Sequence, residues 1–116
     1  MANIDNGVML GALGSVFVDT DASIVPPTGM VIVAIQMITN NNIHTLVAEE
    51  PSRFFNTAEA ANGVGAGNET VDVGSGGQTV SSSGHQFPAG MTIYGRWINA
   101  KFAADSSGGV ICYFGY

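Results

Sequence analysis

The chain is poor in charge, and above all in positive charge. Only 3 of its 116 residues are Lys or Arg, against 9 Asp or Glu, which gives a formal net charge of −6. Binding to nucleic acid depends on cations that displace counterions from phosphates, and binding to an anionic membrane depends on basic clusters. The sequence therefore predicts that neither nucleic acid nor a membrane is a partner.

Cysteine and long apolar runs are also scarce. Cys112 is the single cysteine, so the sequence excludes an intrachain disulfide and a zinc site built from several cysteines. No apolar run approaches the roughly 20 residues of a membrane-spanning helix, and Met1–Asp5 lacks the basic start and apolar core of a signal peptide. We expect a protein that is made in a cytoplasm and is not exported by that route, with Cys112 as a small buried apolar residue.

Small neutral polar residues and glycine take the place of the missing charge. Charged residues make up 10% of the chain, against about 25% in typical soluble domains, while apolar residues stand at 46%. A surface of amides and hydroxyls costs much less to desolvate than a surface of ions. This composition favours a subunit that packs into an assembly, and the length suits one domain with one core.

Apolar, β-branched runs predict strands along most of the chain. Turn formers separate these runs at intervals of roughly 8–12 residues, as in an all-β sandwich or barrel. Gly29–Thr39 is the strongest strand signal, while glycines at 7, 11 and 14 favour a strand over a helix for Val8–Val18. The predicted strands are Val8–Val18, Gly29–Thr39, Ile43–Ala48, Met91–Ala103 and Val110–Gly115, with weaker pieces at Glu69–Val73 and Gln78–Ser82.

Two pairs of these strands are close enough in sequence to form hairpins. Asn40–Asn42 tolerates left-handed backbone and would join the strands on either side of it. A loop of turn formers at 105–109 would join Met91–Ala103 to Val110–Gly115 and tie the C-terminal strand into the sheet. We therefore expect one antiparallel β domain over residues 1–116, a sandwich or barrel of jelly-roll-like type.

The stretch between the two predicted hairpins has a different composition. Pro51–Ala61 predicts one short helix, with Pro51 in its first turn and the pair Phe54 and Phe55 facing inward. Residues 61–86 are rich in glycine among Ser, Asn and Thr. A loop of this length inside a compact domain usually serves binding, so we expect the variable contact surface there.

A short motif occurs twice. Pro27-Thr28-Gly29-Met30-Val31-Ile32 and Pro88-Ala89-Gly90-Met91-Thr92-Ile93 share the pattern P-x-G-M-x-I. Pro and Gly in these positions end a loop and begin a strand. We expect two sheet elements that are entered by similar turns, and not a repeat array, which needs more copies.

Motifs for catalysis and ligand binding are weak throughout the sequence. The glycines of 63–67 lack the flanking strand and helix of a phosphate loop, and Asp19 with Asp21 lacks the later ligands of a calcium loop. Ser83 and His85 belong to no recognisable hydrolase motif. The sequence therefore predicts a protein that is not an enzyme, with no catalytic residue, cofactor or metal, and a small hydrolase is a remote alternative.

The segment around Trp97 carries the strongest signal for a protein interface. In an alternating strand Met91, Ile93, Gly95 and Trp97 share one face, and Thr92, Tyr94, Arg96, Ile98 and Phe102 share the other, so both faces hold large apolar groups. Tyr and Arg are enriched where partners dock, although a mixed edge of the core would show the same composition. The interface candidates are Tyr94, Arg96, Trp97, Phe54 and Phe55.

The C-terminal pattern resembles a known family. Residues 87–97 read FPAGMTIYGRW and residues 110–115 read VICYFG, and both resemble small virion structural proteins of tailed bacteriophages, notably those of cyanobacterial and other marine hosts. The segment Phe54–Ala58 looks similar as well. The resemblance implies a virion component and transfers no functional residue.

The expected function is that of a capsid decoration or cement protein that binds the outside of an assembled phage head. Its partners would be further copies of itself, in a homotrimer or another symmetric oligomer, and the major capsid protein or other virion proteins. The alternative is a tail-fibre or receptor-binding module whose glycine-rich loop contacts a host glycan. Either protein would be found in the virion.

Overall fold

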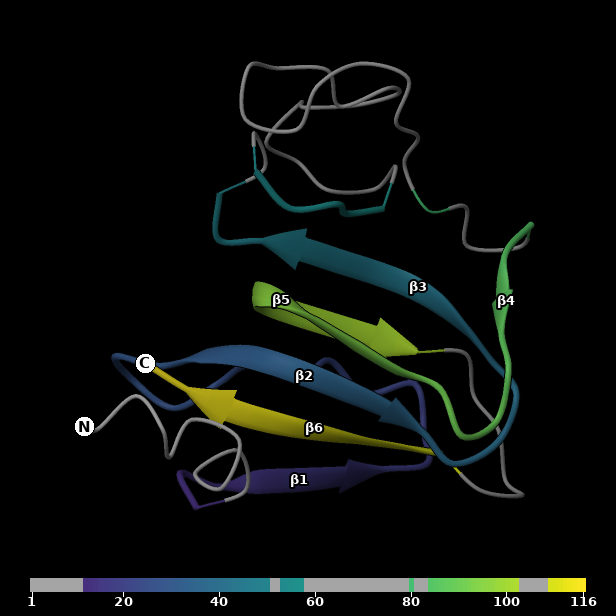
Figure 1. Cartoon of the computed structure of the whole chain (residues 1–116), viewed down its shortest axis with the longest axis horizontal. Helices are drawn as coiled ribbons and strands as arrows, with labels where there is room; N and C mark the ends of the chain where they lie inside the picture. Colours follow the sequence, from purple (N-terminus) through teal and green to yellow (C-terminus); the bar gives the residue numbers. More distant parts are fainter. Residues whose placement is uncertain (1–11, 51–52, 58–79, 81–83, 103–108) are drawn as a thin grey trace.

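A computed structural model describes residues 12–50, 53–57, 80, 84–102 and 109–116. These residues form an all-β fold with a single antiparallel sheet of six strands in the order β1-β6-β2-β5-β3-β4 (Figure 1). The strands are β1 (Ser15–Val18), β2 (Val31–Met37), β3 (Asn41–Ala48), β4 (Gln86–Phe87), β5 (Thr92–Phe102) and β6 (Val110–Gly115).

The all-β prediction is confirmed, and the main predicted strands are present where the structure describes them. β6 has the predicted bounds, and β2, β3 and β5 differ from theirs by a few residues at the ends. The predicted strand Glu69–Val73 lies outside the described residues. Of Gln78–Ser82 only Val80 is described, and it forms an isolated parallel bridge with Thr57.

Neither predicted hairpin forms. β5 lies between β2 and β3, and β2 lies between β5 and β6, so the two strands of each predicted hairpin are separated by one strand in space (Figure 1). Two asparagines of the predicted turn at 40–42 bind other segments: Ala89 N donates to Asn40 Oδ1 (2.8 Å), and Asn42 Nδ2 donates to His85 O (3.1 Å). These side chains tie the segment around β4 to β3 and do not form a tight turn.

The repeated P-x-G-M-x-I motif forms the same turn twice. In each copy the Met N–H donates to the Pro carbonyl, at 2.9 Å in the first and 3.2 Å in the second. Gly29 and Gly90 have φ of 84° and 87°, as the third residue of a type II turn requires. The turns begin β2 and β5, which are antiparallel neighbours at the centre of the sheet. The expectation of two sheet elements entered by similar turns is confirmed.

The core lies on one face of the sheet. The registers of β1, β6, β2 and β5 align the inward side chains in rows across neighbouring strands. These rows are Val18, Val110 and Met37, then Val16, Cys112, Ile35 and Ile93, then Phe114, Ile32 and Trp97, all of them in or against one buried cluster. β3 adds Ile43 and Leu46 to the same cluster, so one continuous apolar interior holds the sheet.

A β-bulge in β5 changes which of its residues face the core. Two consecutive residues of β3 pair with Trp97 and Asn99, so Ile98 is an extra residue in β5. An extra residue reverses the alternation that follows it, and both Trp97 and Phe102 are therefore fully buried. The prediction that Phe102 shares a face with Tyr94 is wrong for this reason.

The predicted helix is not present in the described residues. Of Pro51–Ala61 only 53–57 are described, where Phe54 N donates to Glu50 O (3.1 Å) in one turn and Thr57 N then donates to Leu46 O of β3 (3.0 Å). Most of the predicted glycine-rich loop at 61–86 lies outside the described residues. No helix in the described part of the chain is long and apolar enough to cross a membrane.

Candidate interaction surface

The outer face of the sheet is the surface opposite the core on β1, β6, β2 and β5. The strand registers place two rows of outward residues across it. These residues, which we call the outer face, are Phe17, Ile111, Gln36 and Thr92 in one row and Ser15, Tyr113, Ala34 and Tyr94 in the next. None of them carries a charge at neutral pH.

Two aromatic rings of the outer face are open to solvent. Phe17 is 58% exposed and Tyr94 is 66% exposed, while Ala34, in the row between Tyr113 and Tyr94, is fully buried. Single exposed apolar residues are common on proteins, but several on one face mark a site of interaction. The outer face therefore has the apolar composition of a contact surface.

Two polar side chains of the outer face bond to each other, and a charged pair lies beside it. Tyr113 Oη donates to Gln36 Oε1 (3.0 Å). Beside Tyr94, Arg96 Nε donates to Glu49 Oε1 (2.6 Å) and Nη2 donates to Oε2 (3.3 Å). The hydrogen bond from Arg96 lowers the pKa of the Glu49 carboxyl, while the same bond raises the pKa of Arg96. The charge of Arg96 beside the face is thus neutralised by Glu49.

The five interface candidates divide between the two sides of the sheet. Tyr94 and Arg96 lie on the outer side. Trp97 is fully buried, its Nε1 donates to Phe55 O (3.0 Å), and its ring meets the Phe55 ring edge to face with centroids 5.4 Å apart. Phe54 and Phe55 are half-buried against the core. Trp97 therefore acts as an interior residue in this structure.

Sequence reasoning missed Phe17. Val8–Val18 is apolar in both alternating sets, so the sequence does not say which set faces out. The pairing of Phe17 with Ile111 of β6 decides it, and no local signal predicts that pairing.

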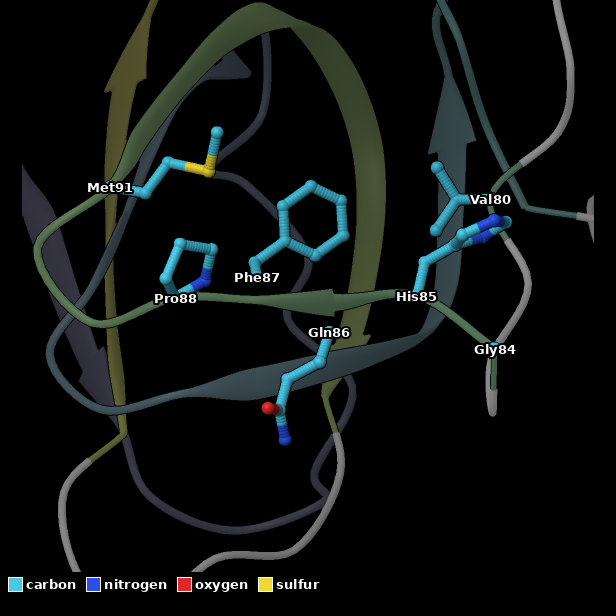
Figure 2. A pocket seen from close by; sticks show the side chains of 7 residues that line it. All are labelled: Val80, Gly84, His85, Gln86, Phe87, Pro88 and Met91. Carbon is cyan, nitrogen blue, oxygen red and sulfur yellow. The ribbon is translucent and has the colours of Figure 1, made fainter.

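A second candidate surface is an open hollow beside β4. It has a volume of about 530 Å³, within the roughly 300–1,000 Å³ of small-ligand sites. Met91 and Pro88 lie at one end and Val80 and His85 at the other, with Phe87 between them (Figure 2). Four of the residues that line it belong to the predicted glycine-rich loop at 61–86, where the sequence led us to expect a contact surface, and the others belong to β4 and the turn before β5.

Two buried amides lie next to the residues that line the hollow. Asn56 is fully buried, and among the described residues neither its Nδ2 nor its Oδ1 has a hydrogen-bond partner, nor does Asn41 Oδ1. Val80 N donates to Asn56 O (2.9 Å), and Asn41 pairs with Phe87. Buried amides are normally hydrogen-bonded, so these two side chains mark the most polar part of the packing beside the hollow.

The described residues offer little for catalysis or metal binding. Within them, no group of three or more His, Cys, Asp and Glu side chains is placed to hold a metal ion. Cys112 is fully buried, as predicted, and burial raises its pKa to about 12, so the thiolate that would react is not formed at neutral pH. Asp19 and Asp21 are exposed and flank a turn in which Ala22 N donates to Thr20 Oγ1 (3.3 Å).

No family model, curated protein or solved structure matches this chain. The arguments that follow therefore rest on the fold, the two candidate surfaces and the sequence itself.

Proposed function

We propose that the protein is a structural component of a tailed-phage virion and that it binds the outside of the assembled head as a decoration protein. The outer face carries this proposal, because an uncharged sheet face with Phe17 and Tyr94 more than half exposed suits a subunit that packs against other subunits in an assembly. The low charge of the chain, 10% of residues, supports it, because neutral polar groups are cheap to desolvate in an assembly.

The resemblance of the C-terminal pattern to phage virion proteins also supports the proposal. Much of that pattern has a structural role: Pro88 and Gly90 form the turn before β5, and Gly95 leaves room for the Trp97 ring, whose Cζ2 lies 2.7 Å from where a Cβ would be. Chains that share the pattern are expected to share this central strand. Their partners would then depend on residues outside it.

The finer fold that belongs to this proposal is a jelly-roll-like sandwich or barrel. A short helix at 51–61 and a glycine-rich loop at 61–86 would complete it, the loop contacting the capsid. The course of β5 supports this fold: it is strongly curved (Figure 2), pairs with β2 over its first half and with β3 over its second, and has its bulge between them. Strands that pass between two packed sheets bend at bulges in this way.

The test is the copy number of this chain in purified virions of the phage that encodes it, measured by quantitative mass spectrometry against the major capsid protein. A decoration protein should be present in hundreds of copies per virion and in a fixed ratio to the major capsid protein. Absence from virions would contradict the proposal.

The second candidate is a tail-fibre or receptor-binding module that contacts a host glycan. The hollow beside β4 favours it, because the ring of Phe87 and the imidazole of His85 lie on the same side of β4 (Figure 2). Sugars bind where a ring and polar groups meet. A copy number of only a few per virion, located at the tail, would select this candidate over decoration.

A further inference from the structure

We propose that the outer face packs against the outer face of a second copy of this chain, giving a dimer with two-fold symmetry. The inference rests on the proposed function, which places many copies of the chain in one assembly. It adds the surface through which the copies meet and the symmetry of their contact.

The exposed area of the outer face suits the centre of such an interface. A fully covered Phe or Tyr side chain buries about 150–250 Å². Phe17 is 58% exposed and Tyr94 is 66% exposed, so a partner could bury roughly 190–310 Å² of their combined side-chain surface. One side of a standard interface buries about 800 Å², so the two rings supply roughly a quarter to two fifths of it. Interfaces concentrate their binding energy in a few such central aromatic residues.

The charge distribution favours a second copy as the partner. The chain has a net charge of −6, so two copies repel each other over most approaches. The rows of the outer face carry no charge at neutral pH, and Arg96 beside them is paired with Glu49. The outer face is therefore a place where two copies can meet without like charges in contact. The Glu49–Arg96 pairs would lie at the polar rim.

The hydrogen bonding of the face argues against a glycan as its partner. A glycan needs side-chain groups that are free to bond its hydroxyls. Here Tyr113 Oη is bonded to Gln36 Oε1, and Arg96 is bonded to Glu49. The hydroxyls of Ser15, Thr92 and Tyr94 also lie on the face, but its two large exposed side chains, Phe17 and Tyr94, are aromatic, which suits sheet-on-sheet packing.

The positions of the two rings fit a two-fold contact. Phe17 on β1 and Tyr94 on β5 lie at opposite sides of the four strands that form the face. A two-fold axis in the plane of the contact, tilted from the strand direction so that it bisects the line from Phe17 to Tyr94, would place Phe17 of one copy against the partner's Tyr94, and the reverse contact follows by symmetry. Each ring would thus be covered by the other.

The test is sedimentation equilibrium of the full chain over a range of micromolar concentrations, in the absence of phage heads. The wild type should form a dimer, and Phe17→Ser/Tyr94→Ser should raise the dissociation constant at least tenfold. Val25→Ser is the matched control, since Val25 is 68% exposed on the connection between β1 and β2, and it should leave the constant unchanged. Thermal melting checks that the variants fold; if the double variant does not, Tyr94→Lys replaces it.

A wild type that stays monomeric, a trimer, or a double variant that associates like the wild type would overturn the inference. Binding of soluble oligosaccharides to a wild-type monomer, lost in the double variant, would also overturn it and assign the face to a glycan. A chain that dimerises as expected but is absent from virions would contradict the proposed function alone. A chain that is abundant in virions yet monomeric, with Tyr94 exposed in them, would contradict the inference alone.

Discussion

At the scale of single residues, Trp97 depends on neighbours that its sequence position does not reveal. Its six-membered ring lies over Gly95, two residues earlier on the same face of β5, and its Nε1 donates to the main chain of Phe55. The glycine therefore serves packing and not a turn. The pair Gly95 and Trp97 works as one unit of the core.

We predict that Gly95→Ala destabilises the fold by about 1–3 kcal/mol, the usual cost of overpacking, because its Cβ would lie 2.7 Å from Trp97 Cζ2. Trp97→Phe removes the part of the ring that would clash, so Gly95→Ala should cost clearly less in that background. Denaturant unfolding of the four proteins in a double-mutant cycle measures the coupling. The same cost in both backgrounds would show that the two side chains do not compete for space.

The ion pair of Glu49 and Arg96 makes a pH prediction. Because the hydrogen bond from Arg96 lowers the Glu49 pKa below its ordinary 4.5, the pair stabilises the folded state above that pH, and its contribution is lost as the pH falls through the lowered value. The melting temperature of the wild type should therefore fall more steeply than that of Glu49→Gln on acidification below about pH 4.5. At neutral pH the difference should be small, because the pair is exposed.

The matched control for the pH prediction is the Arg96→Gln background. In this background Glu49→Gln should no longer change how the melting temperature falls with pH in the acid range. If Glu49→Gln reduces the acid dependence of the melting temperature equally with and without Arg96, the shift in the Glu49 pKa has another cause.

At the scale of elements, the strands could be predicted and their partners could not. Strand positions follow from local apolar patterns, as for Val110–Gly115, and the P-x-G-M turns fix where β2 and β5 begin. Pairing depends on contacts between distant segments. β2 aligns with β5 and β6, and the asparagines after β2 bond to the segment around β4. The short loops therefore suggested hairpins, whereas in the structure each of these strands pairs with strands that are more distant in the sequence.

The candidate surface was predictable only in part, for the same reason. Alternation along the predicted strand indicated that Tyr94 and Arg96 share a side. Alternation could not reveal the bulge at Ile98 that moves Phe102 to the core. It also could not show that Phe17, on β1, lies on the same face of the sheet as Tyr94 and Arg96. Trp97 looked like an interface residue because tryptophans occur in both settings, and only the three-dimensional contact with Phe55 shows which applies here.

The bulge gives a prediction at this scale. Inserting one alanine after Asn99 would add a second extra residue between Trp97 and Phe102 and turn Phe102 outward while Trp97 stays inward. Loss of a buried Phe costs about 3–5 kcal/mol, so the insertion should abolish cooperative unfolding or lower stability by that amount. Deleting Ile98, whose side chain is 44% exposed, restores uninterrupted alternation and leaves both Trp97 and Phe102 inward, so it should cost clearly less than the insertion. Similar melting curves for the two variants would mean that the number of residues between Trp97 and Phe102 does not decide which way Phe102 faces.

At the scale of the whole molecule, the sheet has one closed face and one open one. The closed face holds the core of all five longer strands. The open face presents Phe17 and Tyr94 on an uncharged surface, and the hollow beside β4 is a separate surface that contains Met91. Our account assigns assembly to the open face and leaves the hollow outside that contact.

Hydroxyl-radical footprinting of the wild-type chain tests this assignment most directly, because Phe17, Tyr94 and Met91 are natural probes of the two surfaces. Oxidation of each side chain would be measured by mass spectrometry in dilute solution and again at the concentration where the chain has assembled. The account predicts that oxidation of Phe17 and Tyr94 falls on assembly while oxidation of Met91, 42% exposed beside β4, stays the same. Protection of Met91 with Phe17 and Tyr94 unchanged would contradict it and make the hollow the contact surface.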